Sequence, residues 1–173
     1  MCEPYELWDL YDRDGNRTGE TIARRPGFYQ EVPEGRYHLV VDILVRHADG
    51  TFLVTRRSEE KPLYPGYWEA SAGGSALKGE EPKEAALREL FEETGLTPDT
   101  LELVSTSTKD KSQCIYYSYL AAVHGDKSAV VLQEGETTDF AWVDKNELLR
   151  LINDEELLLP HNLRFLDYLR SLP

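Results

Sequence analysis

The chain has 173 residues, of which 40% are hydrophobic and 29% are charged, and its formal net charge is −13 at pH 7. No apolar run approaches the roughly 20 residues that a membrane-spanning helix needs. The acidic balance excludes the lysine- and arginine-rich stripe of a protein that binds long nucleic acid. A small phosphorylated partner remains open, because divalent cations bridge carboxylates to phosphates.

The N-terminal sequence has neither the basic start nor the apolar core of a secretory signal, so we expect a cytoplasmic protein. Cys2 and Cys114 are too few for a framework of several disulfides, and we expect two free thiols. The chain shows no internal repeat and no long linker, so a single domain over residues 1–173 is predicted.

Alternating apolar residues and turn signals predict the strands. An N-terminal hairpin within about 1–35 has strands at 6–11 and 18–23 around the turn sequence DRDGN. A core hairpin follows from 37–47 and 51–55. Further strands are expected at 101–105, 114–123 and 140–143.

Helices are predicted after the first strands and at the C-terminal end. The central helix runs from Pro82, a residue typical of a first turn, to Thr94, with Gly95 as its stop signal. Two more helices, about 145–153 and 162–171, make up a helical region at about 145–171. Helices packed around a mixed β-sheet indicate an α+β fold or an α/β sandwich.

Glu89, Glu92 and Glu93 fall at i, i+3 and i+4 of the central helix and therefore share one face. Like charges at these spacings cost an isolated helix about 0.2–0.5 kcal/mol per pair, so the cluster calls for a compensating cation. Magnesium suits it, because this ion is held by a few carboxylates, waters and substrate phosphates. The alternative is a solvated acidic face that binds nothing.

The same periodicity orients the other side chains of this helix. Leu87 and Phe91 are expected to point away from the acidic face and into the core. Ala85 lies one turn before Glu89 on the acidic side, where a small side chain leaves room for an ion.

Residues 74–96 read GSALKGEEPKEAALRELFEETGL, which is similar to the signature of the Nudix hydrolase family. The positions that match are Gly74, Glu80, Arg88, Glu89, Leu90, Glu92, Glu93, Gly95 and Leu96. The resemblance implies an α/β/α sandwich with a mixed sheet, and an enzyme that cleaves a pyrophosphate link by attack of a metal-positioned water.

Site roles follow from the resemblance by position. Glu89, Glu92 and Glu93 would bind Mg²⁺, or Mn²⁺ in its place, with the carbonyl of Gly74 as a further ligand. Glu89 is also the box residue best suited to act as base. Glu80 and Arg88 would tie the loop to the helix, with no chemical role.

Residues outside the signature complete the predicted site. Because three metal-bound glutamates can lack a free lone pair, a loop acid that resembles the family pattern, Glu136 or else Glu134, is a candidate base. Arg56, Arg57 and Lys61 are candidates to meet a phosphate, and Tyr64 and Tyr67 to stack on a base or line the pocket. Trp68 is expected in the core.

Two other functions compete with hydrolysis. The stretch 56–74, with His38 upstream, resembles the isopentenyl diphosphate isomerase branch of the superfamily, but residues 71–75 (SAGGS) lack the cysteine and histidine that those enzymes use. His38 is expected to be a strand histidine with satisfied hydrogen bonds, and Cys114 a core residue. A non-catalytic nucleotide sensor is the second alternative, although such domains commonly have a degraded signature. The exposed edges of the N-terminal hairpin could pair in a homodimer.

Overall fold

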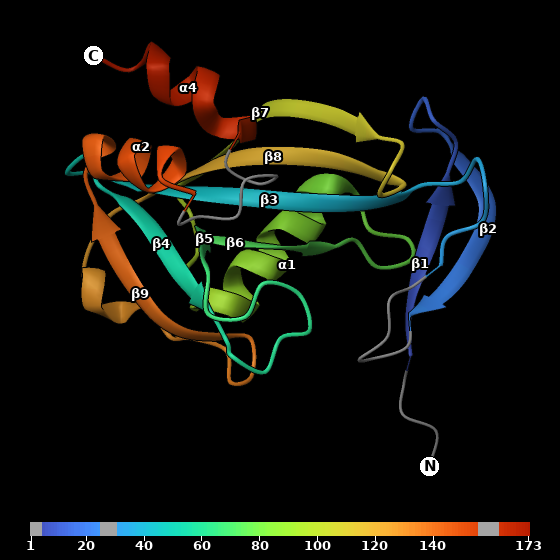
Figure 1. Ribbon diagram of the computed structural model, residues 1–173, viewed down its shortest axis with the longest axis horizontal. Coiled ribbons are helices and arrows are strands. Elements are labelled where there is room, and N and C mark those ends of the chain that lie inside the picture. Colours follow the sequence, from blue (N-terminus) through green and yellow to red (C-terminus); the bar gives the residue numbers. More distant parts are fainter. Residues whose placement is uncertain (1–4, 25–30, 156–162) are drawn as a thin grey trace.

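A computed structural model describes residues 5–24, 31–155 and 163–173 (Figure 1). A mixed sheet of seven strands forms its centre, in the order β5-β4-β3-β8-β7, with β6 paired to β3 and β9 paired to β4. Strands β3 and β8 are parallel, and the other pairs are antiparallel. The strands are β3 (His38–His47), β4 (Phe52–Arg57), β5 (Trp68–Ala70), β6 (Ala72–Ser75), β7 (Thr100–Lys109), β8 (Cys114–Val123) and β9 (Thr137–Val143).

The predicted N-terminal hairpin is confirmed as β1 (Glu6–Tyr11) and β2 (Arg17–Arg24). In its turn, Asp12 Oδ1 accepts hydrogen bonds from the backbone N–H groups of Asp14 and Asn16, both at 2.9 Å. The hairpin stands across one end of the sheet, at the right of Figure 1. It is a separate two-stranded sheet, joined to the body by an isolated antiparallel β-bridge between Tyr11 and Tyr37 and by side-chain and loop contacts.

The predicted core hairpin is correct in its strands and wrong in most of its pairing. Strands β3 and β4 pair only at Arg46 and Phe52, beside the turn. Strand β3 pairs instead along its whole length with β8 and also with β6, while β4 pairs with β9 and β5. Because six of the ten residues of β3 are buried and the other four are half-buried, the strand needs a partner on each edge, and β4 alone does not supply both.

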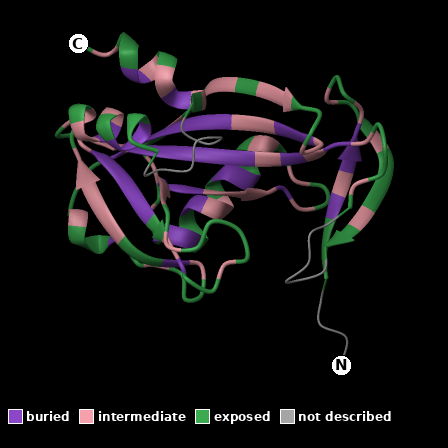
Figure 2. Cartoon of the chain, viewed as in Figure 1, coloured by how far each residue is buried: buried purple, intermediate pink, exposed green. Residues whose placement is uncertain are grey.

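The helices cover both faces of the sheet. Alternate residues of β3, such as Val41 and Ile43, pack with α1 (Pro82–Thr94), whereas Leu44 packs with α2 (Lys145–Asn153) and α4 (Leu166–Ser171). Figure 2 shows the buried residues concentrated between these layers. Short 3₁₀ turns lie at Lys127–Ala129 and Leu163–Phe165. The second of these replaces the start of the predicted helix 162–171, whose residue 162 lies outside the described residues. No described helix has the length and apolar character to cross a membrane.

Helix α1 begins and ends where it was predicted to, but a different face of the helix is buried. Glu81 and Glu84 form a reciprocal capping box at its start, and Gly95 ends it with a left-handed φ of 71°. However, Leu87 and Phe91 are 38% and 60% exposed, so the prediction that they enter the core is wrong. The inward face carries Ala85, Ala86, Leu90 and Glu93. Ala85 is fully buried in this packing.

Candidate active site

A partly buried ion pair joins α1 to the loop before it. Arg88 donates from Nε and Nη2 to the two carboxylate oxygens of Glu80 at 2.7 and 2.9 Å, and from Nη2 to the carbonyl of Ser75 at 3.1 Å. Glu80 also accepts from the N–H of Leu77 at 2.8 Å. Burial favours protonation of Glu80, but these hydrogen bonds outweigh it and lower its pKa. The geometry agrees with the structural role predicted for Glu80 and Arg88.

The same arginine also holds two of the predicted metal ligands. Its Nη1 donates to Glu89 at 2.8 Å and to Glu92 at 3.1 Å. The Glu89 side chain is only 13% exposed, and its carboxylate lies directly against Gly74, where a Cβ atom would stand 2.7 Å from Oε2. Burial raises the pKa of Glu89 in spite of Arg88.

Glu93 is the most buried of the three glutamates, at 8% exposure. Its Oε2 accepts a hydrogen bond from the N–H of Gly73 at 3.1 Å. Burial, together with the nearby carboxylates of Glu69, Glu89 and Glu136, raises its pKa well above the usual range. A carboxylate placed among other carboxylates and away from water is a site that gains strongly from a bound cation.

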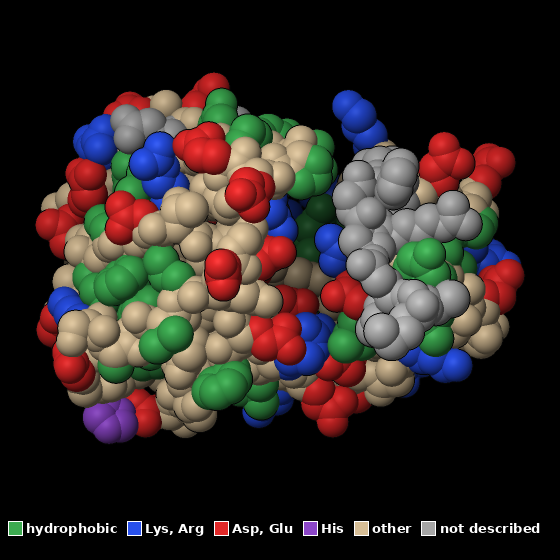
Figure 3. Space-filling model, turned by 90° about the horizontal axis from the view of Figure 1, so that it is seen from below, with side chains coloured by type: hydrophobic (Ala, Val, Ile, Leu, Met, Phe, Trp, Pro, Cys, Tyr) green, Lys and Arg blue, Asp and Glu red, His purple; other side chains and the backbone are tan. Residues whose placement is uncertain are grey.

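Glu89, Glu92 and Glu93 line one cavity of about 220 Å³. It opens into the hollow between the body of the molecule and the N-terminal hairpin, where acidic and basic side chains gather (Figure 3). Its lining residues are Glu6, Arg24, Arg57, Lys61, Gly73, Gly74, Ser75, Arg88, Glu89, Glu92, Glu93, Gln133 and Glu136. We call this cavity the acidic pocket. As the side chains stand, no three His, Cys, Asp or Glu groups of the described chain converge closely enough to hold a metal ion.

The acidic pocket contains some of the residues that were predicted to bind the substrate or to act as the base. Arg57 lies in its wall and donates to Glu69 at 3.2 Å, and Lys61 forms an ion pair with Glu136. Of the two loop acids, Glu136 therefore faces the pocket. Glu134 is exposed and is not among the residues that line it.

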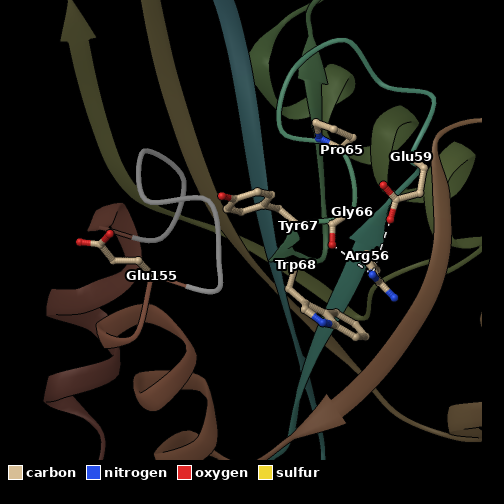
Figure 4. A pocket seen from close by; sticks show the side chains of 7 residues that line it. All are labelled: Arg56, Glu59, Pro65, Gly66, Tyr67, Trp68 and Glu155. Carbon is tan, nitrogen blue, oxygen red and sulfur yellow. Dashed lines mark hydrogen bonds and ion pairs between the residues drawn. The ribbon is translucent and has the colours of Figure 1, made fainter.

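Arg56 and Tyr67 lie elsewhere, in a second cavity of about 450 Å³ (Figure 4). Arg56 donates to the carbonyl of Gly66 at 3.0 Å, and the ring of Tyr67 meets that of the exposed Tyr64 edge to face at 5.8 Å. Neighbouring residues of β4 alternate between the two faces of the sheet, so Arg56 and Arg57 point in opposite directions. Four of the five predicted substrate-binding residues are thus divided between two cavities, and Tyr64 lines neither of them.

Of the three residues set aside as structural, Cys114 is buried and His38 lies in β3 as expected, whereas Trp68 is only partly in the core. Cys114 is a buried free thiol 3.6 Å from Nε2 of His38. The His38 ring stacks on Trp8, with centroids 4.4 Å apart. Trp68 is half-buried, packs against the core beside α2 and α4, and also lines the second cavity. Cys2 lies outside the described residues.

Several residues in or beside the acidic pocket could not be predicted from the sequence. Glu6 and Arg24 come from the hairpin and Gln133 from the loop before β9; Glu69 of β5 does not line the pocket but is near enough to raise the pKa of Glu93. Only the docking of distant segments places them there, and no local pattern marks them.

Comparisons with known proteins identify the family of the chain. The NUDIX domain family matches residues 36–167. An uncharacterized Nudix hydrolase of Listeria monocytogenes is 31% identical over 153 residues, which cover 88% of each chain. The isopentenyl-diphosphate Delta-isomerase of Clavibacter sepedonicus is 30% identical over 159 residues, 86% of this chain and 79% of the isomerase. The crystal structure of DR0079 from Deinococcus radiodurans has a TM-score of 0.68 and 22% identity, and the match covers 86% of this chain and 90% of that one.

The chain therefore belongs to the Nudix family. Its α+β architecture is the Nudix fold predicted from the sequence. Its relatives identify it as an enzyme of the pyrophosphohydrolase type.

Proposed function

We propose that the protein is a magnesium-dependent hydrolase that cleaves the pyrophosphate bond of a nucleoside diphosphate linked to another group, or of a related small diphosphate. The observation that carries the proposal is the acidic pocket, which Glu89, Glu92 and Glu93 line together and where Arg57 and Lys61 supply positive charge. Long nucleic acid does not fit a chain of net charge −13. A cytoplasmic location, a single domain and a homodimer stay predictions.

The donor set fits a hard divalent cation. Glu89, Glu92 and Glu93, with the carbonyl of Gly74, would hold it, and all of these residues line the acidic pocket. Oxygen ligands select magnesium or manganese over softer metals. The raised pKa values of Glu89 and Glu93 fit the same assignment, because a cation would stabilise their charged forms. When bound, magnesium neutralises phosphate oxygens and increases the acidity of a water molecule.

The protein groups have separate tasks. Arg88 fixes the positions of Glu89 and Glu92 through its hydrogen bonds to both. Lys61 is paired with Glu136, and a substrate phosphate competes for the same ammonium group. Phosphate binding would thus release Glu136 to accept a proton from the attacking water. Glu89 is the alternative base, and Glu134 is the weaker candidate because it is exposed away from the pocket.

Isomerisation is the second candidate, because an isopentenyl-diphosphate isomerase is among the relatives. That chemistry needs a group to give and a group to take a proton at carbon. The described residues that line the acidic pocket include no cysteine and no histidine, and Gly73, Gly74 and Ser75 occupy the stretch where the isomerases carry them. The pocket therefore favours water as the nucleophile.

The experiment is a panel of diphosphates incubated with the protein and magnesium. It includes a nucleotide sugar, ADP-ribose, a dinucleoside polyphosphate, a coenzyme and a non-nucleotide diphosphate, with products measured by chromatography. We expect at least one compound to be cleaved at the pyrophosphate link by wild type, and the Glu93→Gln variant to be inactive toward it. Binding of a panel member without turnover would instead identify a sensor, and no binding and no turnover would contradict the proposal.

A further inference from the structure

The N-terminal hairpin lies outside the matched family segment 36–167, yet it is docked on the loop that precedes α1. The N–H of Lys78 donates to the carbonyl of Leu7 at 2.6 Å. The N–H of Gly79 donates to the carboxylate of Asp9 at 2.8 Å. Two backbone groups of the loop are therefore satisfied by β1.

Arg17 of β2 adds a second set of contacts to the same loop. It donates to the carbonyl of Glu80 at 2.7 Å and to the carboxylate of Glu81 at 2.8 Å. It also lies 3.3 Å from Asp9, which links both strands of the hairpin to the loop. The hairpin is thus held in a defined position relative to the glutamates of α1.

This docking places one end of the hairpin in the wall of the acidic pocket. Glu6 and Arg24 are directly opposite each other in the β1–β2 pairing, and both line the pocket. Arg24 Nη1 lies 3.0 Å from Glu6 Oε2. The Arg24 guanidinium also lies over the ring of Trp8, at 5.6 Å from its centroid, and Trp8 is buried against His38 of β3.

Arg24 is the basic group of the pocket that is most available to a ligand. Its side chain is 45% exposed, whereas those of Arg57, Lys61 and Arg88 are 18%, 19% and 23% exposed and are paired with partly buried carboxylates of the site. Its own partner, Glu6, is 49% exposed. An exposed ion pair contributes little stability, so an incoming phosphate displaces the carboxylate at small cost.

We propose that Arg24 binds a phosphate group of the substrate and that Glu6 occupies it when the pocket holds no substrate. The hairpin is then a substrate-binding part of the enzyme, supplied by a segment outside the matched family region. This inference rests on the proposed function, because it uses the same pocket. It adds an anion-binding residue that the sequence analysis did not identify.

The test uses methylenediphosphonate, a pyrophosphate analogue whose carbon bridge water does not cleave, titrated into the full chain in excess magnesium by calorimetry. Arg24→Ala should weaken binding about tenfold, the loss expected from one charge-assisted contact at a half-exposed site. Glu6→Gln should strengthen binding several-fold, because it removes the competing carboxylate. Arg13→Ala is the matched control, since Arg13 forms a similar exposed pair with Asp110 and does not line the pocket.

The opposite signs of the two variants distinguish ligand binding from a structural role. Both variants break the same ion pair, so a purely structural pair would give equal weakening in both, and that result would overturn the proposal. Unchanged affinity in Arg24→Ala, or no binding by wild type, would overturn it as well. Because the analogue is not cleaved, the binding test does not depend on turnover. Weaker binding in Arg24→Ala and stronger binding in Glu6→Gln, in a protein that cleaves no diphosphate, would refute only the proposed function. Turnover by wild type with an unchanged KM in Arg24→Ala would refute only the role of Arg24.

Discussion

Replacing Gly74 with alanine tests whether catalysis depends on the position of Glu89. The added Cβ would stand 2.7 Å from Glu89 Oε2, where ordinary contacts are 3.4–4 Å. The carboxylate must therefore move by about 1 Å, a displacement that costs about 10²-fold in turnover when it affects a reacting group. Gly74 does not have a left-handed φ, and the obstructing group is the end of a side chain, so the free energy of unfolding should change by less than about 1 kcal/mol.

The assay compares kcat on the best panel substrate with the thermal unfolding midpoint. Gly73→Ala is the contrasting variant, because its Cβ would stand 2.8 Å from the backbone carbonyl of Val41, which cannot move aside. Gly73→Ala should lower the unfolding midpoint, whereas Gly74→Ala should lower only kcat.

A double variant gives a second test of the contact between Gly74 and Glu89. Shortening Glu89 to aspartate withdraws the carboxylate from the new methyl group, so Gly74→Ala with Glu89→Asp should be more active than the product of the two single effects predicts. Full activity in Gly74→Ala, or strict additivity in the double variant, would refute the proposed contact between Gly74 and Glu89.

Three further predictions concern the base, acid stability and isomerisation. Glu136→Gln should lower kcat far more than it changes KM, and Glu134→Gln should do little; near-normal kcat in both would return the base to Glu89. Burial lowers the pKa of His38 from 6.5 to about 4. Between pH 6.5 and about 4, His38 is therefore neutral in the folded state and protonated in the unfolded chain. At about 1.36 kcal/mol per pKa unit, the free energy of unfolding should fall by about 3 kcal/mol as the pH drops through this range. His38→Phe should flatten this part of the pH–stability curve and the exposed control His124→Gln should not; equal curves for both variants would contradict it. The pure protein should not convert isopentenyl to dimethylallyl diphosphate, and detection of the product would disprove the assignment.

Local signals were enough to predict the elements near the site. The ends of α1 depend on Pro82, on the capping residues beside it and on Gly95, all within a few positions of the helix itself. The hairpin turn depends on Asp12 and its immediate neighbours. Such features are encoded by adjacent residues, and the sequence therefore locates them to within a few residues.

Long-range features could not be predicted in the same way. The parallel partner of β3 is β8, which follows it in sequence only after four strands and a helix. The strands β5 and β6 are short, and β6 contains two adjacent glycines, so they carry no strand pattern.

The orientation of α1 shows why periodicity alone misled. Periodicity groups the residues of one helix face but does not say which face is buried. The apolar Leu87 and Phe91 lie outward while the charged Glu93 lies inward, as expected where function conflicts with packing. Glu6 and Arg24 line the pocket because the hairpin docks beside it, and no local sequence pattern predicts this docking.

The most direct test of the central claim is the turnover of the best panel substrate as magnesium is removed and restored. Because the proposal places a cation among Glu89, Glu92 and Glu93, turnover should vanish in excess chelator and return with magnesium or manganese. Glu93→Gln should lose at least about 10²-fold in kcat at saturating magnesium while its fold, measured by circular dichroism, is retained. Undiminished turnover in excess chelator, or full activity in Glu93→Gln, would contradict the claim that this cluster carries the reaction.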